Sequence, residues 1–302
     1  MIRKILNAIK QPKILFTLIL NKMKFLPDKT YLKLRYRLEF GKKLDLKNPK
    51  SFNEKLNWLK LYDRKPIYNT MVDKYEVRKY ISETIGEEYL IPLIGIWNSF
   101  DEIDFDALPE QFVLKCTHDS GSVVICKDKN KFDYNAAKRK LERKFNKNLY
   151  WWAREWVYKD LTPRIIAEKY MNDGIHDDMV DYKFFCFNGK PEYIYVSENL
   201  SDHKNGAISF YDMDFNEAPF KRTDFKKLDH APEKPESFDK MVELAKILSK
   251  DNYFLRVDFY DICGKIYFGE LTFCPAAGYM PIVPQEWDLK LGEMMDIKGD
   301  IE

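Results

Sequence analysis

The sequence feature that most constrains the fold is a set of apolar segments that come in pairs around short polar turns. Near the C-terminus, residues 254–260 and 266–273 are rich in aromatic and branched side chains and are separated by residues 261–265, which include Gly264. Two similar pairs occur earlier, at residues 112–126 and 181–196, the second around an Asn-Gly dipeptide typical of a type I′ turn. Antiparallel hairpins interleaved with helices predict an α+β fold and not a doubly wound parallel sheet.

The last hairpin carries charged residues within its apolar strands. Arg256 and Asp258 alternate on the first strand, and Glu270 and Thr272 alternate on the second, so each pair shares one strand face. Pairing of the strands can bring Asp258 beside Glu270, where two carboxylates repel unless a cation lies between them. Hard oxygen ligands suit Mg²⁺ or Mn²⁺. The alternative is a solvated charged hairpin, which the apolar flanking residues disfavour.

Helices are predicted between the hairpins. A capping box at residues 51–54 starts one helix, and a second cap signature starts another at Thr70 that runs to about Ile85. Further helices are predicted at residues 132–146, 149–158, 237–249 and near 289–295, and a further strand at 164–171.

A lysine in the apolar strand 112–116 is the second unusual feature. Lys115 leads into a polar loop of small residues, whose backbone N–H groups can cradle phosphates while the ammonium group neutralises them. The loop residues expected to contribute are His118, Ser120, Gly121 and Ser122. The alternative is a strand-edge lysine above an ordinary turn. The chain has no GxxxxGK[ST] loop, no GxGxxG turn and no HExxH motif, so a nucleotide site must be built differently.

The charge of the chain is concentrated at its start. Residues 1–50 hold 14 Lys and Arg against three acidic residues, a net charge of +11, whereas the whole chain carries only +2 and does not read as a nucleic-acid binder. The apolar run at residues 14–20 is too short to span a bilayer. Residues 1–30 therefore read either as a basic amphipathic segment on a membrane surface or as an ordinary docking helix. Five scattered cysteines fit reduced thiols, so we expect a cytoplasmic protein, peripheral on the inner face of the membrane under the first interpretation.

Taken in order, these features resemble the ATP-grasp superfamily, especially the branch typified by the teichuronopeptide-synthesis protein of bacterial surface-polysaccharide clusters. The resemblance covers about residues 50–295. It implies an ATP-grasp fold, in which two α+β lobes grip ATP, behind a basic N-terminal segment. The expected parts are residues 1–50 (basic helical segment), 51–110 (helical and mixed lobe), 111–170 (small subdomain with the phosphate-covering loop) and 171–302 (C-terminal subdomain with the metal site).

The resemblance also implies residue roles. Glu168 would lie near adenine, with the adjoining Lys169, Tyr170 and Met171 reading the base edge and Asp181 binding the ribose. The phosphates would meet Lys74, Lys115 and the loop that follows Lys115. Lys183 and Arg256 would act in catalysis. Two Mg²⁺ ions, or Mn²⁺ as an alternative, would be held by Asp258, Glu270 and Thr272.

By this resemblance the expected reaction is ATP-dependent amide formation through an acyl phosphate, between an amine or amino acid and a carboxylate on a surface glycan or lipid-linked glycan. Three alternatives stay open. A glycosyltransferase would use the Asp212-Met213-Asp214 triplet for its metal. A phosphotransferase of the same fold would phosphorylate a hydroxyl. A scaffold with a degenerate pocket is suggested by Thr272, which stands where the family usually has Asn.

Overall fold

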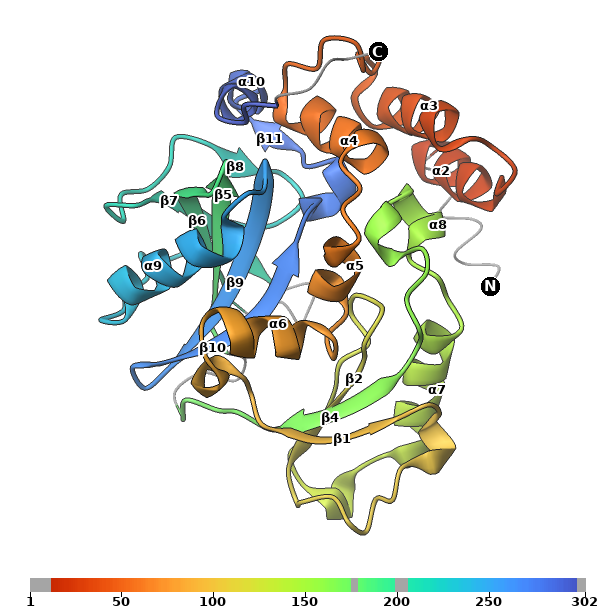
Figure 1. Ribbon diagram of the computed structural model, residues 1–302, viewed down its shortest axis with the longest axis vertical. Helices are drawn as coiled ribbons and strands as arrows, with labels where there is room; N and C mark the ends of the chain where they lie inside the picture. Colours follow the sequence, from red (N-terminus) through yellow and green to blue (C-terminus); the bar gives the residue numbers. More distant parts are fainter. Residues whose placement is uncertain (1–11, 175–178, 199–205, 298–302) are drawn as a thin grey trace.

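The computed structural model describes residues 12–174, 179–198 and 206–297 (Figure 1). Within these residues there are two main antiparallel sheets, one with strand order β1-β4-β2-β3 and one with order β10-β9-β5-β6-β7, and a short β11-β8 pair. The smaller sheet lies at the bottom of the view and the larger sheet lies above it on the left, with α3, α4 and α10 at the top (Figure 1). The predicted α+β class is confirmed.

The smaller sheet has one face covered by helix α7 (Tyr134–Phe145). Its apolar side chains alternate along β2 and β4, as a half-buried strand requires, so Lys115 and Glu168 lie on the face away from α7. The strands are β1 (Leu93–Trp97), β2 (Phe112–Cys116), β3 (Val124–Cys126) and β4 (Ile165–Lys169). Because β1 pairs with β4, this sheet joins segments from both sides of residue 110. The domain boundaries drawn from the sequence stay a prediction.

The larger sheet has one face covered by helix α9 (Phe238–Ser249), whose apolar stripe packs on β5, β6 and β9. The expected type I′ turn is present, because Asn188 and Gly189 both have positive φ, 47° and 79°. The strands are β5 (Asp181–Phe187), β6 (Lys190–Glu198), β7 (Ala207–Asp212), β9 (Phe254–Ile262) and β10 (Lys265–Thr272), with β8 (Lys221–Arg222) and β11 (Ile282–Val283) in the short pair.

The opposite face of the larger sheet changes character along its length. At one end it is aromatic: Phe52 of helix α4 (Phe52–Tyr62) has its ring centroid 5.0 Å from that of Phe254 and also contacts Phe185. Further along the same face, Lys183 lies opposite Asp258 in the β5–β9 ladder. The aromatic end of this face packs against α4, whereas the end with Lys183 and Asp258 lies beyond that apolar contact.

The helices confirm some sequence expectations and correct others. The capping box at Ser51 and Glu54 is present. The helix expected from Thr70 to Ile85 is wrong: α5 (Ile67–Val72) begins after Pro66 and ends at Asp73, and α6 (Val77–Thr84) follows. A proline favours a helix start, and the Asp73 carboxylate accepts hydrogen bonds from the next turn, at Tyr75 N (2.9 Å) and Glu76 N (3.0 Å).

The aromatic segment 149–158 is also divided. Arg154 has a left-handed backbone (φ 56°) that separates α8 (Tyr150–Ala153) from a 3₁₀ turn, η4 (Trp156–Tyr158). The remaining helices are α2 (Pro12–Lys22), α3 (Asp28–Phe40) and α10 (Glu286–Glu293), with 3₁₀ turns η1 (Glu87–Tyr89), η2 (Phe100–Glu102), η3 (Lys129–Lys131) and η5 (Pro275–Gly278). Among the described residues, none of the helices has the length and apolar character needed to cross a membrane.

The contact between α10 and α4 predicts a position that tolerates no side chain. A Cβ added at Gly292 would lie 2.1 Å from the Lys50 carbonyl oxygen and 2.8 Å from Phe52 N, and backbone atoms cannot move aside as a flexible side chain can. We expect Gly292→Ala to lower the free energy of unfolding by about 2–3 kcal/mol, measured by urea denaturation. Leu289→Ala, on the exposed side of α10, is the control. Equal stabilities of the two variants would contradict the packing described.

Candidate functional site

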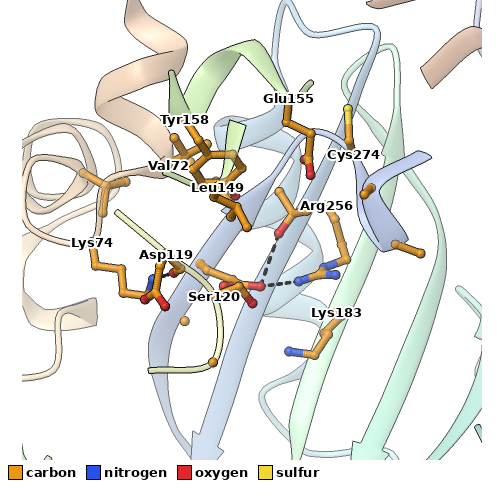
Figure 2. Close-up of a pocket in the computed structure, with 18 of the residues that line it drawn as sticks. Val72, Lys74, Asp119, Ser120, Leu149, Glu155, Tyr158, Lys183, Arg256 and Cys274 are labelled. Carbon is orange, nitrogen blue, oxygen red and sulfur yellow. Dashed lines mark hydrogen bonds and ion pairs between the residues drawn. The ribbon is translucent and has the colours of Figure 1, made fainter. Parts of the chain in front are cut away.

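A cleft of about 620 Å³ lies between the two sheets and is lined from both (Figure 2). Lys183 and Arg256 lie on one side of it, and Lys74 with the Asp119–Ser120 loop lies on the other (Figure 2). The predicted site residues that line this cleft are Lys74, Lys115, Ser120, Gly121, Glu168, Asp181, Lys183, Arg256, Glu270 and Thr272.

A β-bulge sets the geometry of the last hairpin. Phe268 pairs with Phe259, but the register then shifts, so that Glu270 and not Gly269 stands opposite Asp258. The shift turns Glu270 to the cleft face, whereas an unbroken ladder would turn it towards the α9 core. At Gly269 an added Cβ would lie 3.1 Å from the Asp258 carbonyl oxygen, so the bulge depends on close backbone approach. The predicted pairing of Asp258 with Glu270 is confirmed. The glycine inside the strand indicates a bulge, which the sequence analysis did not take into account.

A guanidinium group fills the space between these carboxylates. Arg256 donates from Nε to Asp258 Oδ1 (2.7 Å) and from Nη2 to Asp258 Oδ2 (2.6 Å), and Nη2 also bonds Glu270 Oε1. Lys183 Nζ donates to Asp258 Oδ2 (2.9 Å) and pairs with Asp181 Oδ1 at 3.0 Å. Asp258 is fully buried and does not line the cleft, so its role is first to hold the two cations.

The charges of this network stabilise one another. Burial acts to raise the pKa of Glu270, but Arg256, Lys183 and Lys74 outweigh it and lower that pKa to about 2. Burial acts to lower the pKa of Lys183, yet Asp181 and Asp258 raise it well above the ordinary lysine value. Glu270 is therefore anionic and Lys183 cationic at neutral pH.

The donor set of the hairpin suits a hard divalent cation. The Glu270 carboxylate is 43 % exposed to the cleft, and the Thr272 hydroxyl lies 3.2 Å from its Oε1. Carboxylate and hydroxyl oxygens are ligands that Mg²⁺ accepts. Among the described residues no cluster of three His, Cys, Asp or Glu side chains forms a complete protein cage for a metal. Glu270 and Thr272 are the donors that an ion in the cleft would meet, with Asp258 behind them.

The opposite wall is a second ionic group. Lys115 Nζ donates to Glu168 Oε2 (2.7 Å), and Arg78 Nη1 donates to Glu168 Oε1 (3.2 Å). Arg78, from α6, lines the cleft and was missed by sequence reasoning.

The loop after β2 is tied by two lysines. Lys74 Nζ donates to the Asp119 carbonyl oxygen, and Lys144, from α7, donates to the Ser120 carbonyl oxygen (2.7 Å). Ser120 and Gly121 thereby face the cleft. Lys144 is a second residue that sequence reasoning missed.

Two of the four expected loop residues do not reach the cleft. The Ser122 hydroxyl accepts from Cys116 N (2.9 Å) and donates to Asp119, so it is used within the loop. His118 is buried beside the Phe145 ring, and burial lowers its pKa. A phosphate role for Ser122 and His118 stays a prediction that their positions do not favour.

The residues after Glu168 lie elsewhere as well. Lys169 N donates to Pro92 O (2.9 Å), and the Lys169 and Tyr170 side chains line a separate pocket with Lys127. Alternate residues of a strand face opposite sides, which explains why Glu168 reaches the cleft and Lys169 does not. Met171 lines neither pocket. The base-reading role of these three residues stays a prediction.

The far end of the cleft was not foreseen. It is lined by Glu155 and Tyr158 from the α8–η4 region and by the segment that follows β10. Glu155 and Cys274 are seen above Arg256 in Figure 2. Helix α3 adds Arg35 and Glu39, although it lies far from the hairpin in sequence. Remaining residues of this end are Trp152, Arg222, Asp224, Ala276, Ala277 and Tyr279.

The acidic triplet considered for a glycosyltransferase does not line the cleft. Asp212 Oδ1 instead accepts hydrogen bonds from Asp214 N (3.0 Å) and Asn216 N (2.8 Å) and so closes the turn after β7. Its carboxylate has a structural role at this turn.

Comparison with known proteins places the chain in a family. The model of the TupA-like ATPgrasp family matches residues 54–296. No curated protein sequence matches the chain.

Solved structures with a similar arrangement are distant. They include D-alanine–D-alanine ligase from Bacillus anthracis complexed with ATP (16 % identity, TM-score 0.42, 75 % of this chain and 65 % of that one). D-alanine–D-alanine ligase from Helicobacter pylori has 14 % identity and a TM-score of 0.41 over 82 % of this chain and 70 % of that one. A RimK domain ATP-grasp protein from Sphaerobacter thermophilus has 9 % identity and a TM-score of 0.39 over 75 % and 67 %. The chain thus spans 65 % of the first enzyme's length. On the family match, which covers most of its length, this chain belongs to the TupA-like ATP-grasp family.

Proposed function

We propose that the protein is an ATP- and Mg²⁺-dependent carboxylate–amine ligase that works through an acyl phosphate. One observation carries the proposal: a single cleft collects cationic side chains and a pair of hard oxygen donors from both main sheets and from the turn after α5. The cations that would meet the phosphates are Lys74, Lys115, Lys183 and Arg256, and the cleft-facing donors are Glu270 and Thr272. This combination suits a triphosphate with its metal.

The triphosphate would lie along the cationic strip, with Lys115 and the Ser120–Gly121 backbone on one side and Lys183 on the other. Mg²⁺, as two ions or with Mn²⁺ in its place, would be held by Glu270 and Thr272 with Asp258 behind them. Bound there, it offsets the negative charge of the phosphates. The ribose and adenine would extend towards Asp181 and Glu168.

In the first half-reaction a substrate carboxylate oxygen attacks the γ-phosphorus, and ADP leaves. The acyl phosphate formed has a good leaving group, which a free carboxylate lacks. In the second half-reaction an amine attacks the acyl carbon, the C–N bond forms, and phosphate departs. Arg256 would stabilise the oxyanion that develops on the acyl oxygen, because its guanidinium is fixed in place by Asp258.

The substrates we propose are a carboxylate on a cell-surface glycan or lipid-linked glycan, such as a uronic acid, and an amino acid or other amine. The support is the family's link to surface-polysaccharide clusters and the mixed polar and aromatic lining of the far end of the cleft. Under this proposal the protein acts in the bacterial cytoplasm.

Trapping of the acyl phosphate tests the reaction class. The purified chain is incubated with Mg-ATP, hydroxylamine and each of a panel of uronic acids and amino acids, and hydroxamate and ADP are measured. Equal amounts of hydroxamate and ADP are expected. ADP with a phosphorylated hydroxyl and no hydroxamate would indicate the phosphotransferase, and failure to bind ATP would indicate the scaffold.

The N-terminal helices support a contact with the membrane surface. Helix α2 buries only part of its apolar surface. Thr17 and Leu20 face inward and are buried, whereas the Phe16 side chain is 56 % exposed. Phe25, in the turn before α3, is 79 % exposed. Other exposed apolar residues here are Ile14, Leu18, Ile19 and Leu34, and the exposed lysines are Lys13, Lys22, Lys24, Lys29 and Lys33. Aromatic side chains among lysines suit an anionic lipid surface. Residues 1–11, also part of this expectation, lie outside the described residues.

Vesicle binding tests this contact. We expect the chain to sediment with phosphatidylcholine vesicles only when they contain phosphatidylglycerol. The double variant Phe16→Ser, Phe25→Ser should bind at least about tenfold more weakly, since each phenylalanine contributes about 1.5–3 kcal/mol when fully buried. Ile247→Ser, an exposed apolar residue on α9, is the matched control. Unchanged binding of the double variant would contradict the membrane contact.

A further inference from the structure

One carboxylate in the cleft differs from all the others in its partners. Glu155 is only 7 % exposed, yet in the described part of the chain its carboxylate has no hydrogen bond or ion pair. The other cleft carboxylates each have a cation within 4 Å: Glu39 has Arg35, Asp119 has Lys144, Glu168 has Lys115, Asp181 has Lys183, Asp224 has Arg222 and Glu270 has Arg256.

Lys60 is the cation that acts electrostatically on Glu155, but its ammonium group binds other partners. Lys60 Nζ donates to the carbonyl oxygens of Ala153 (3.1 Å) and Ala277 (2.6 Å) and to Asn57 Oδ1 (3.2 Å). Its three donors are thereby used, and it forms no direct contact with Glu155. A carboxylate buried without a direct partner is costly, so its retention at this place requires a reason outside the folded chain.

The position of Glu155 indicates what the partner does. Its side chain points into the cleft from the side of Cys274, above Arg256 (Figure 2). Tyr158, also in the cleft wall, experiences the charges of both Glu155 and Glu270. Glu155 therefore lines the cleft within electrostatic range of the tyrosine that also senses Glu270, near the proposed phosphoryl-transfer end.

Resting on the ligase function proposed above, we propose that Glu155 binds the ammonium group of the amine substrate and removes its proton. An ammonium ion supplies the cation that Glu155 lacks. The carboxylate of the other substrate cannot take this place, since two anions would then be buried together.

The proton balance of the second half-reaction fits this role. Glu155 takes one proton from the ammonium, which frees the nitrogen lone pair. The amine attacks the acyl carbon, the C–O bond to phosphate breaks, and the second nitrogen proton leaves with the phosphate. Burial raises the pKa of Glu155 to about 7, although Lys60 opposes the change, so the group can accept and release a proton near neutral pH.

Hydroxylamine separates this role from carboxylate activation, because it is already a neutral nucleophile at pH 7. With the uronic acid that gives the most hydroxamate, Glu155→Gln should form hydroxamate at the wild-type rate. With each amino acid as the nucleophile, it should form amide about 10²-fold more slowly or worse. The wild-type amide rate should rise with pH around 7, and this rise should be absent from Glu155→Gln. The other titratable groups facing Glu155 are Lys60 of α4, Tyr158 of η4, and Cys274 and Tyr279 of the segment after β10.

Controls distinguish a local effect from loss of the fold. Glu192→Gln removes a carboxylate of the larger sheet that is paired with Lys190 and does not line the cleft, and it should leave both rates unchanged. Glu155→Asp keeps the charge and should recover part of the amide rate if Glu155→Gln folds poorly. Equal losses of hydroxamate and amide in Glu155→Gln, or no loss of amide, would overturn the inference. No hydroxamate from the wild type would instead overturn the ligase function, and the inference with it.

Discussion

Glu270→Gln should lower the rate of ATP-dependent hydroxamate formation by about 10²-fold or more while leaving the chain folded. The carboxylate faces the cleft, and its low pKa means that it is charged throughout the physiological range. Loss of a metal-holding charge removes several kcal/mol of transition-state stabilisation, and each 1.4 kcal/mol is a factor of ten. The rate should recover partly at high Mg²⁺, because the affinity for the ion is what the substitution weakens. Glu192→Gln, on β6 of the same sheet and paired with Lys190, is the control.

The same variant has a predicted pH signature. The pKa of Glu270 falls from an ordinary 4.5 to about 2 in the folded chain, so its stabilising effect is complete above pH 4.5 and is lost as the pH falls towards 2. The stability gap between wild type and Glu270→Gln should therefore narrow over this range in acid titrations followed by circular dichroism. Wild-type catalysis in Glu270→Gln would show that the hairpin carboxylates serve the structure only.

The second large effect is a gain in stability. Glu155→Gln should be more stable than wild type at pH 8 by up to about 3.5 kcal/mol, because the pKa of Glu155 rises from 4.5 to about 7 and each unit corresponds to about 1.4 kcal/mol. The sign follows from linkage: the folded chain binds the Glu155 proton more tightly than the unfolded chain does. The folded state is thus penalised as the pH rises from 4.5 through 7.

Urea denaturation at several pH values measures this gain. The advantage of Glu155→Gln should be largest at pH 8 and should shrink towards pH 5, where the wild-type carboxyl is protonated. The titratable groups near Glu155 are Lys60, Tyr158, Cys274 and Tyr279, and Lys60 is the only cation among them. A variant less stable than wild type at pH 8 would show that attraction to Lys60 exceeds the cost of burial. A group that is costly to the fold and still present is a candidate for function.

The sequence was informative where local pattern determines geometry. Alternation within the apolar strands placed Arg256 and Asp258 on one face, and the same rule placed Lys115 away from the small core. Hairpins around Asn188 and within residues 261–265 could be predicted from their turn residues, although the second turn is shorter than expected and consists of Cys263 and Gly264. Order along the chain then supported the ATP-grasp resemblance, which the family match confirms.

The rest depended on contacts between distant segments. A glycine within a strand indicates a bulge, but the register shift at Gly269 is defined only once β9 pairs with β10. Arg256 was expected to act in catalysis, and its position between Asp258 and Glu270 could be seen only from the side-chain geometry. The environment of Glu155 comes from segments that lie about 95 and 120 residues away in sequence, at Lys60 and Cys274, so no local pattern marks it.

Binding of a non-hydrolysable ATP analogue, measured by calorimetry with and without Mg²⁺, tests the central claim most directly. The cleft described here predicts one binding site for the analogue that is strengthened by Mg²⁺. Lys115→Ala should weaken this binding in both conditions, whereas Glu270→Gln should remove mainly the gain from Mg²⁺. No binding, or binding that neither Mg²⁺ nor these two substitutions alter, would contradict the assignment of this cleft to Mg-ATP.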